Sequence, residues 1–283
     1  AHWAEHKEIS QNFSILKYEP QLWRMGACRP TIDGTIVGFE KKGKDTYALI
    51  DTSDVHTLMI AAAGTGKTTF FLEPNIEYCC AAGMSFISTD TKGDIYRNCG
   101  YVAAKRYGYK ISVIDLRNPL KSDGFNLLHL VKKYMDEHKN NPLNISAKAK
   151  SERYAKIVAD SIIAADGDKY GANTYFYDAA KGLIAALILI IAEYGNDKEC
   201  HIVSVLKLMI ELLEAKPQKK SQLKSETYFA DLIKLLPPEH KARWLSGAAI
   251  NNADQAALSV ISTALSRLNS LIDTETEQIL CFN

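Results

Sequence analysis

The pattern of apolar and polar positions changes character near residue 128. Before it, short apolar runs alternate with helical patterns; after it, apolar residues recur only at helical spacing. The runs at 57–60, 84–89 and 110–114 are typical of buried parallel strands. Helical stretches at 67–82, disturbed at Pro74, and at 95–107 separate them. This alternation predicts a parallel sheet with right-handed crossovers.

A β-hairpin is expected ahead of these units. Residues 35–40 and 46–50 have the composition of strands, and residues 41–45 between them form a turn around Gly43. The lysines of this turn are interpreted as a solvated tip. Residues 1–30 are polar and mixed, and we expect their aromatic residues to anchor them: Trp3, Tyr18 and Trp23.

Consecutive helices are predicted after residue 128. The stretch 175–192 predicts a long buried helix that ends near Gly195, and its most apolar run, 182–192, is about half the length that spans a bilayer. Further apolar stripes occur at helical spacing, and we interpret them as core positions. They fall at 154–162, at 205–213, within the helix 228–236, and at Leu258, Ile261, Leu265, Leu268 and Ile272.

The main chemical signal lies between the first apolar run and the first helix. This stretch fits the phosphate-binding loop pattern, except that Ala61 stands where the first glycine is usual. Small residues let backbone N–H groups turn toward phosphate oxygens, and the positive end of the next helix faces the anion. The candidate nucleotide-binding residues are Ala61, Ala62, Ala63, Gly64, Thr65, Gly66, Lys67, Thr68 and Thr69.

Two residues of the loop have specific expected roles. Lys67 is a candidate catalytic residue that reaches the β- and γ-phosphates, and the Thr68 hydroxyl is the candidate Mg²⁺ ligand. The predicted cofactors are therefore ATP and Mg²⁺. Ala61 needs only a backbone conformation open to a small L-residue, so we expect nucleotide binding to survive this departure from the pattern.

A P-loop hydrolase also needs an acidic residue after a strand, because carboxylates hold Mg²⁺ and position water. Asp90 and Asp115 each end an apolar run, and neither precedes a Glu. Asp90 is the second candidate catalytic residue; the equally weighted alternative is that it caps the next helix. Asp115 is interpreted as a turn residue before Asn118. No later stretch predicts a catalytic acidic strand, so we expect weak or no ATP hydrolysis from this chain alone.

Composition adds few constraints. The net charge of +1 over 283 residues neither favours nor excludes nucleic acid as a partner. Basic residues cluster at 216–224, interpreted as a solvated loop with polyanion binding as the alternative, and at 148–156, interpreted as a solvated face. The six cysteines have no zinc spacing, and the neighbouring Cys79 and Cys80 are expected to be buried reduced thiols. The chain has no initiator Met and no signal peptide, so we expect it to be part of a longer protein.

The chain resembles the TraG family of type IV secretion coupling proteins in five stretches that keep the family's order. Residues 56–68 look like the family's strand and P-loop. Residues 90–94 are similar to its Asp-Pro-Lys-Gly-Glu signature, with Thr91 for Pro and Asp94 for Glu. The other similar stretches are 1–4 with 8–9, 125–128, and 175–176 with 179–180.

This resemblance implies an α/β fold: a RecA-like P-loop NTPase, with a partial parallel sheet here and an inserted all-α domain. It implies a conjugative DNA-transfer coupling ATPase that links relaxase-bound DNA to a type IV secretion channel. It also implies a homo-oligomer, a hexamer at full length, at the cytoplasmic face of the bacterial cell membrane. Segments outside this chain would reach the membrane. The implied partners are DNA, relaxase cargo and other secretion-channel proteins.

The expected division has three parts. Residues 1–128 are the N-terminal segment and RecA-like nucleotide-binding half, 129–272 the all-α domain that meets DNA and cargo, and 273–283 the start of a return to the α/β core. The alternative function is a cargo-binding adaptor in which nucleotide controls assembly rather than DNA translocation. A small-molecule kinase is disfavoured, because no Arg-rich acceptor lid is present.

Overall fold

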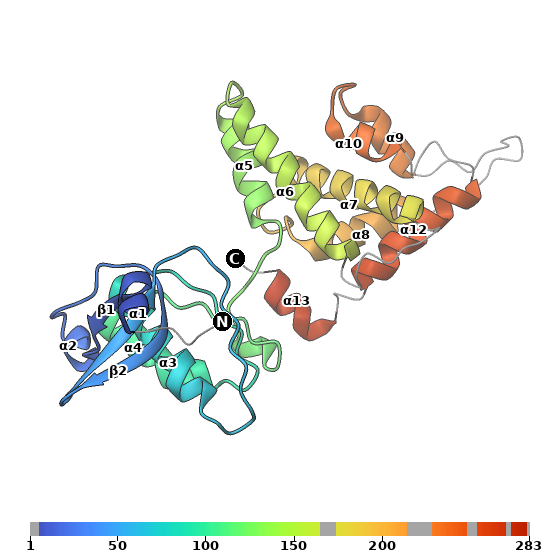
Figure 1. The fold of residues 1–283 in the computed structure, drawn as a ribbon. Coiled ribbons are helices and arrows are strands. Elements are labelled where there is room, and N and C mark those ends of the chain that lie inside the picture. Colours follow the sequence, from blue (N-terminus) through green and yellow to red (C-terminus); the bar gives the residue numbers. More distant parts are fainter. Residues whose placement is uncertain (1–5, 165–173, 214–227, 248–253, 270–272, 282–283) are drawn as a thin grey trace, which may run out of the picture. The chain divides into compact units, whose positions relative to one another are not determined.

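The computed structural model describes residues 6–164, 174–213, 228–247, 254–269 and 273–281 (Figure 1). They belong to two compact units, one up to Ser112 and one from Val113. The three-part division at residues 128 and 272 stays a prediction.

The first unit contains a small antiparallel sheet. Its strands β1 (Ser14–Lys17), β2 (Thr35–Lys42) and β3 (Asp45–Asp51) have the spatial order β1-β3-β2. The predicted hairpin is confirmed: β2 and β3 pair antiparallel, and Gly43 in their turn has a φ of +65°. Strand β1 and the short helices α1 (His6–Asn12) and α2 (Pro20–Arg24) lie in the segment that the sequence left unassigned.

The predicted parallel sheet is wrong. In the described chain, none of the apolar runs 57–60, 84–89 and 110–114 forms a strand, and the only sheet is antiparallel. Leu58, Ile60 and Ile87 are 84%, 86% and 99% exposed. A parallel strand is buried only when neighbouring strands pair with it and helices cover both of its faces. Among the described residues these runs pair with no strand, and the helix that follows residue 67 packs against the antiparallel sheet.

The helix predicted from residue 67 is confirmed, with a change of winding. A π-helical turn, η1 (Thr68–Leu72), leads into α3 (Glu73–Ala82), which ends at Gly83 with a φ of +79°. Pro74 lies at the start of α3, directly after η1, and its missing N–H removes one helical donor at this junction. The disturbance expected at Pro74 therefore falls just before it, in η1.

Helix α3 packs on two sides. One side faces the sheet and α2, in a cluster of Trp23, Ile36, Ala48, Ile50, Tyr78 and Ala81. The other side places Ile76 and Cys80 against Ala103 of α4 (Asp94–Tyr107). Helix α4 ends at Gly108, as predicted. Trp23 is 1% exposed, which confirms its expected anchoring role, whereas Trp3 lies outside the described residues.

Asn75 joins α3 to the edge of the sheet. Its Oδ1 accepts a hydrogen bond from Ile36 N at 2.7 Å, and its Nδ2 donates to Ile36 O at 3.0 Å. Nδ2 also donates to Phe71 O at 2.9 Å. Because β2 is an edge strand, this amide satisfies groups that would otherwise be open to another strand.

The second unit is helical in its described part, as predicted. Its elements are η2 (Pro119–Lys121), α5 (His129–Asn140), α6 (Ile145–Ile163), α7 (Thr174–Tyr194), α8 (Ile202–Leu213), α9 (Tyr228–Leu235), α10 (Lys241–Leu245), α12 (Asp254–Asn269) and α13 (Thr274–Leu280).

Helix α7 is the centre of the second unit. Helices α5, α6, α8, α10 and α12 all pack against it (Figure 1). Every side chain from Leu183 to Ala192 is buried, which confirms the predicted core helix. Of the described helices, α7 is the one long and apolar enough to cross a membrane, and most of it is buried inside the unit. At Gly182 a Cβ would lie 2.5 Å from Leu245 O, so glycine permits the close approach of α10.

The stripe predicted for α12 is partly wrong. Leu258 is 65% exposed, whereas Val260 and Ala264 are fully buried together with Leu268. Ile272 and the basic cluster 216–224 lie outside the described residues. The six cysteines are free thiols; Cys80 is buried, as expected, whereas Cys79 is only partly buried.

Candidate functional site

The candidate site is the turn at residues 61–69 that precedes η1. Gly64 and Gly66 have φ values of +77° and +84°, which L-residues with side chains rarely adopt. A Cβ on Gly66 would also lie 2.5 Å from the Phe70 ring. Ala61 is not among the positive-φ residues. A small L-residue therefore fits at this position, as predicted.

The ammonium of Lys67 folds back onto the start of the turn. Its Nζ donates hydrogen bonds to Ala61 O and to Ala62 O, both at 2.7 Å. Thr65 Oγ1 also donates to Ala62 O, at 2.8 Å. Because an ammonium has three N–H groups, one remains for a further acceptor. The Lys67 ammonium thus bridges the end of the turn to its start.

Backbone donors at the start of the helix complete the site. Phe70 N donates to Gly66 O at 2.8 Å. The N–H groups of Gly66, Lys67 and Thr68 donate no hydrogen bond within the described chain. Free N–H groups at a helix start, beside an ammonium, favour an anion. This donor set, with the exposed Thr68 side chain next to it, fits a phosphate group and an associated cation.

Asp90 is placed as a helix cap. Its Oδ1 accepts hydrogen bonds from Gly93 N at 2.9 Å and from Lys92 N at 3.3 Å, and its Oδ2 accepts from Tyr96 N at 3.1 Å. Among the described residues, no hydrogen bond or ion pair joins Asp90 to Lys67 or Thr68. The geometry favours the capping alternative, and the catalytic role of Asp90 stays a prediction.

Asp115 is a turn residue, as interpreted from the sequence. Its Oδ1 accepts hydrogen bonds from Arg117 N at 2.9 Å and from Asn118 N at 3.1 Å. These bonds close the turn that leads to η2, so this carboxylate has a local structural role.

The capping role of Asp90 predicts a pH-dependent stability. Desolvation raises the pKa of Asp90, but the backbone N–H groups of Tyr96, Lys92, Gly93 and Ile95 outweigh it, so the net pKa is lowered. A carboxylate with a lowered native pKa stabilises the fold above its unfolded-state pKa, about 3.9. That contribution is lost as the pH falls through the native value. Asp90→Asn is therefore expected to lower Tm at neutral pH and to converge with the wild type once the pH falls below the lowered native pKa of Asp90.

Thermal unfolding followed by circular dichroism across this pH range measures the effect. Asp94→Asn is the matched control, because Asp94 lies in the first turn of the same helix and its one ion pair in the described part of the chain is with the exposed Arg97. A Tm difference for Asp90→Asn that is the same at every pH contradicts the capping assignment.

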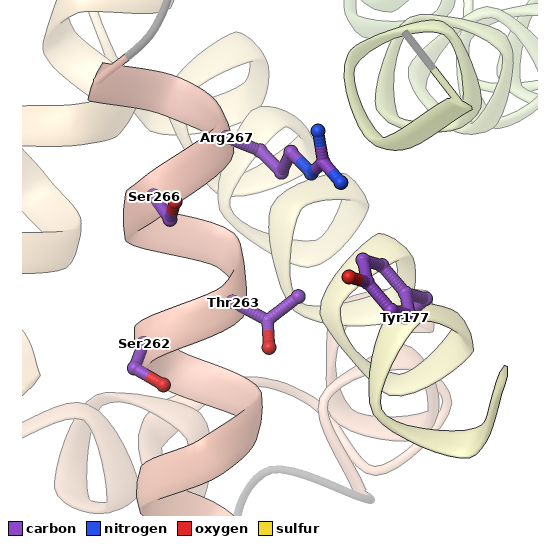
Figure 2. A pocket seen from close by; sticks show the side chains of 5 residues that line it. All are labelled: Tyr177, Ser262, Thr263, Ser266 and Arg267. Atoms are coloured by element: carbon purple, nitrogen blue, oxygen red, sulfur yellow. The ribbon is translucent and has the colours of Figure 1, made fainter. Parts of the chain in front are cut away.

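A hollow lies between α7 and α12 (Figure 2). It has a volume of about 360 Å³ and is lined by Tyr177, Ser262, Thr263, Ser266 and Arg267. Arg267 reaches across toward α7, with its Cζ 5.6 Å from the centroid of the Tyr177 ring. Ser262 and Thr263 donate their hydroxyl hydrogens to Ser259 O within α12. No sequence motif indicates this hollow, because it depends on the packing of helices that are distant along the chain.

A family model described as type IV secretory system conjugative DNA transfer matches residues 3–282 of the chain. The match extends over both units and includes the turn at 61–69. Comparison with curated proteins and comparison with solved structures found no match.

Proposed function

The chain belongs to the type IV secretory system conjugative DNA transfer family, and from this premise we propose that it is the nucleotide-binding part of a coupling ATPase. The coupling ATPase links relaxase-bound DNA to the secretion channel. The family match confirms the resemblance to TraG-like coupling proteins and supports a role in conjugative DNA transfer.

The geometry of the turn at residues 61–69 is the observation that carries the nucleotide-binding proposal. Residues 61–69 would hold the phosphates of ATP, and the Thr68 hydroxyl would hold Mg²⁺. Bound ATP supplies a phosphoanhydride bond whose hydrolysis releases free energy for movement. Lys67 and the N–H groups of Gly66 and Thr68 neutralise and orient the phosphate charge. Two parts of the expected RecA-like P-loop fold support the proposal: the turn at 61–69 and the helix that follows it, η1 with α3.

The family places the protein in a bacterial, membrane-associated secretion system. We further propose that the protein lies at the cytoplasmic face of the membrane and forms a homo-hexamer at full length. It would contact other channel proteins and bind DNA and relaxase cargo through its helical unit.

The alternative function is a cargo-binding adaptor in which nucleotide controls assembly. The polar hollow between α7 and α12 favours it, because a guanidinium and a phenol can bind a protein side chain there. Both functions use the turn at 61–69, so nucleotide binding alone does not separate them.

ATP turnover by the protein at its natural length separates the two functions. For a motor, DNA is expected to raise the turnover rate, and Lys67→Ala is expected to remove both basal and stimulated turnover. Lys44→Ala, which removes the same charge from the exposed hairpin turn, is the control and should keep the DNA response. Turnover that ignores DNA, together with relaxase binding to the helical unit, would favour the adaptor.

A further inference from the structure

The hollow between α7 and α12 is lined by two pairs of polar residues from α12 and one tyrosine from α7. Ser262 and Thr263 lie one helical turn before Ser266 and Arg267, so the two pairs follow one another along the helix. Figure 2 shows Arg267 and Thr263 extending from α12 toward Tyr177. The volume of about 360 Å³ falls within the range of small-molecule sites, roughly 300–1,000 Å³. The hollow is therefore large enough for a small polar ligand that spans both pairs.

One end of the hollow supplies positive charge and hydrogen-bond donors. The guanidinium of Arg267 has five N–H donors, so a ligand does not require it to give up its contact with the Tyr177 ring. The exposed Ser266 hydroxyl lies next to it in the sequence. Of the described residues that line the hollow, none carries a carboxylate, and the neighbouring Asp178 pairs with Lys181 at 3.4 Å. This end favours an anion.

The other end supplies hydrogen-bond acceptors. Ser262 Oγ and Thr263 Oγ1 donate their hydrogens to Ser259 O, at 3.1 Å and 2.8 Å. A hydroxyl oxygen also has two lone pairs, which accept hydrogen bonds from a ligand. Lone pairs repel an anion and attract a neutral hydroxyl group. The hollow therefore matches a ligand with a negative group at one end and hydroxyl groups at the other.

We propose that this hollow binds a small phosphorylated sugar. The phosphoryl group fits the guanidinium of Arg267, because arginine binds phosphate through two parallel N–H···O bonds. The sugar hydroxyls would donate to Ser262 and Thr263, one helical turn or about 5.4 Å away along α12. An acidic protein side chain would use the donor end alone. The site belongs to the second unit and goes beyond the proposed function of the turn at 61–69.

Isothermal titration calorimetry of the natural-length protein with ribose 5-phosphate tests the proposal. Ribose 5-phosphate is expected to bind at least about tenfold more tightly than inorganic phosphate or ribose, because it engages both ends of the hollow. Arg267→Lys keeps a positive charge in the last turn of α12 but loses the planar fork. This variant is expected to bind ribose 5-phosphate at least about tenfold more weakly than the wild type.

The double substitution Ser262→Ala, Thr263→Val removes the acceptor end of the hollow. It is expected to weaken binding of ribose 5-phosphate about fivefold to tenfold and to leave the binding of inorganic phosphate unchanged. The matched controls are Arg153→Lys and Ser161→Ala on α6. Arg153 is exposed, and the exposed Ser161 donates to Ile157 O at 2.9 Å, as the serine of the hollow does within its own helix. Both controls should keep wild-type affinity, and circular dichroism checks that every variant is folded.

Four results would overturn the proposal. They are no binding of ribose 5-phosphate, equal binding of inorganic phosphate, equal binding of glutamate, and equal competition by an oligodeoxythymidylate. Equal binding of glutamate would assign the hollow to an acidic protein side chain, and equal competition by the oligonucleotide would assign it to DNA.

The turn at 61–69 is tested in the same titrations. Lys67→Ala is expected to keep its affinity for ribose 5-phosphate, and Arg267→Lys is expected to bind Mg–ATP normally. If Lys67→Ala loses ribose 5-phosphate, the turn binds the ester and the inference is wrong. If Mg–ATP binds but Arg267→Lys keeps full affinity for ribose 5-phosphate, the inference fails and the nucleotide-binding proposal stands.

Discussion

Replacing Lys67 by Ala is expected to weaken Mg–ATP binding by about tenfold to a hundredfold. The ammonium is the one side-chain cation of the turn at 61–69, and a hydrogen bond to a charged group contributes about 1.5–3 kcal/mol. In the structure this ammonium donates to Ala61 O and Ala62 O, and the N–H groups of Gly66 and Thr68 in the same turn donate to no acceptor among the described residues. Isothermal titration calorimetry with Mg–ATP measures the change.

Lys44→Ala is the matched control for this experiment. It removes the same charge from the first unit, but at an exposed residue of the turn between β2 and β3. Its ATP affinity should equal that of the wild type. If Lys67→Ala binds Mg–ATP as tightly as Lys44→Ala, the turn does not hold the phosphates and the nucleotide-binding proposal is wrong.

The substitution Asn75→Leu is expected to lower the free energy of unfolding of the first unit by about 2–5 kcal/mol. The leucine removes the partners of Ile36 N and Ile36 O, and each buried group left without a hydrogen bond costs about 1–3 kcal/mol. It also removes the bond to Phe71 O. Urea unfolding, followed by the fluorescence of the buried Trp23, measures the loss.

Asn98→Ala provides the comparison for Asn75. Asn98 is exposed on α4 and donates to Glu73 Oε1 at 2.9 Å, so its removal should change stability by no more than about 0.5 kcal/mol. Similar losses for the two variants would show that the amide of Asn75 does not hold α3 to the edge of β2.

The elements that the sequence predicted well are those specified by neighbouring residues. The hairpin around Gly43 and the helix ends at Gly83 and Gly108 need a left-handed backbone conformation at a single residue, and glycine supplies it wherever the chain folds. The turn at 61–69 is equally local, because its glycines and Lys67 lie within a few residues of one another. The candidate site was therefore predictable without any knowledge of packing.

Asp90 shows where local information becomes ambiguous. A carboxylate after an apolar run suits either a metal site or a helix cap, and the sequence gives equal support to both. The backbone N–H groups of Gly93 and Tyr96 turn toward the carboxylate in the folded chain, so the geometry favours the cap. The stacking of Tyr134 on Tyr154 has no local signature either, since these rings meet only because α5 and α6 pair.

By itself, the sequence determined the glycine-rich turn at 61–69, the helix ends, the hairpin and the helical character of the second unit, because each depends on residues close together along the chain. Tertiary structure alone decided that the runs at 57–60, 84–89 and 110–114 form no sheet, because a parallel strand depends on distant partners. It also decided that Val260 rather than Leu258 is buried in α12. An apolar stripe shows that a helix has a buried side, but the neighbouring helices select which residues that side contains.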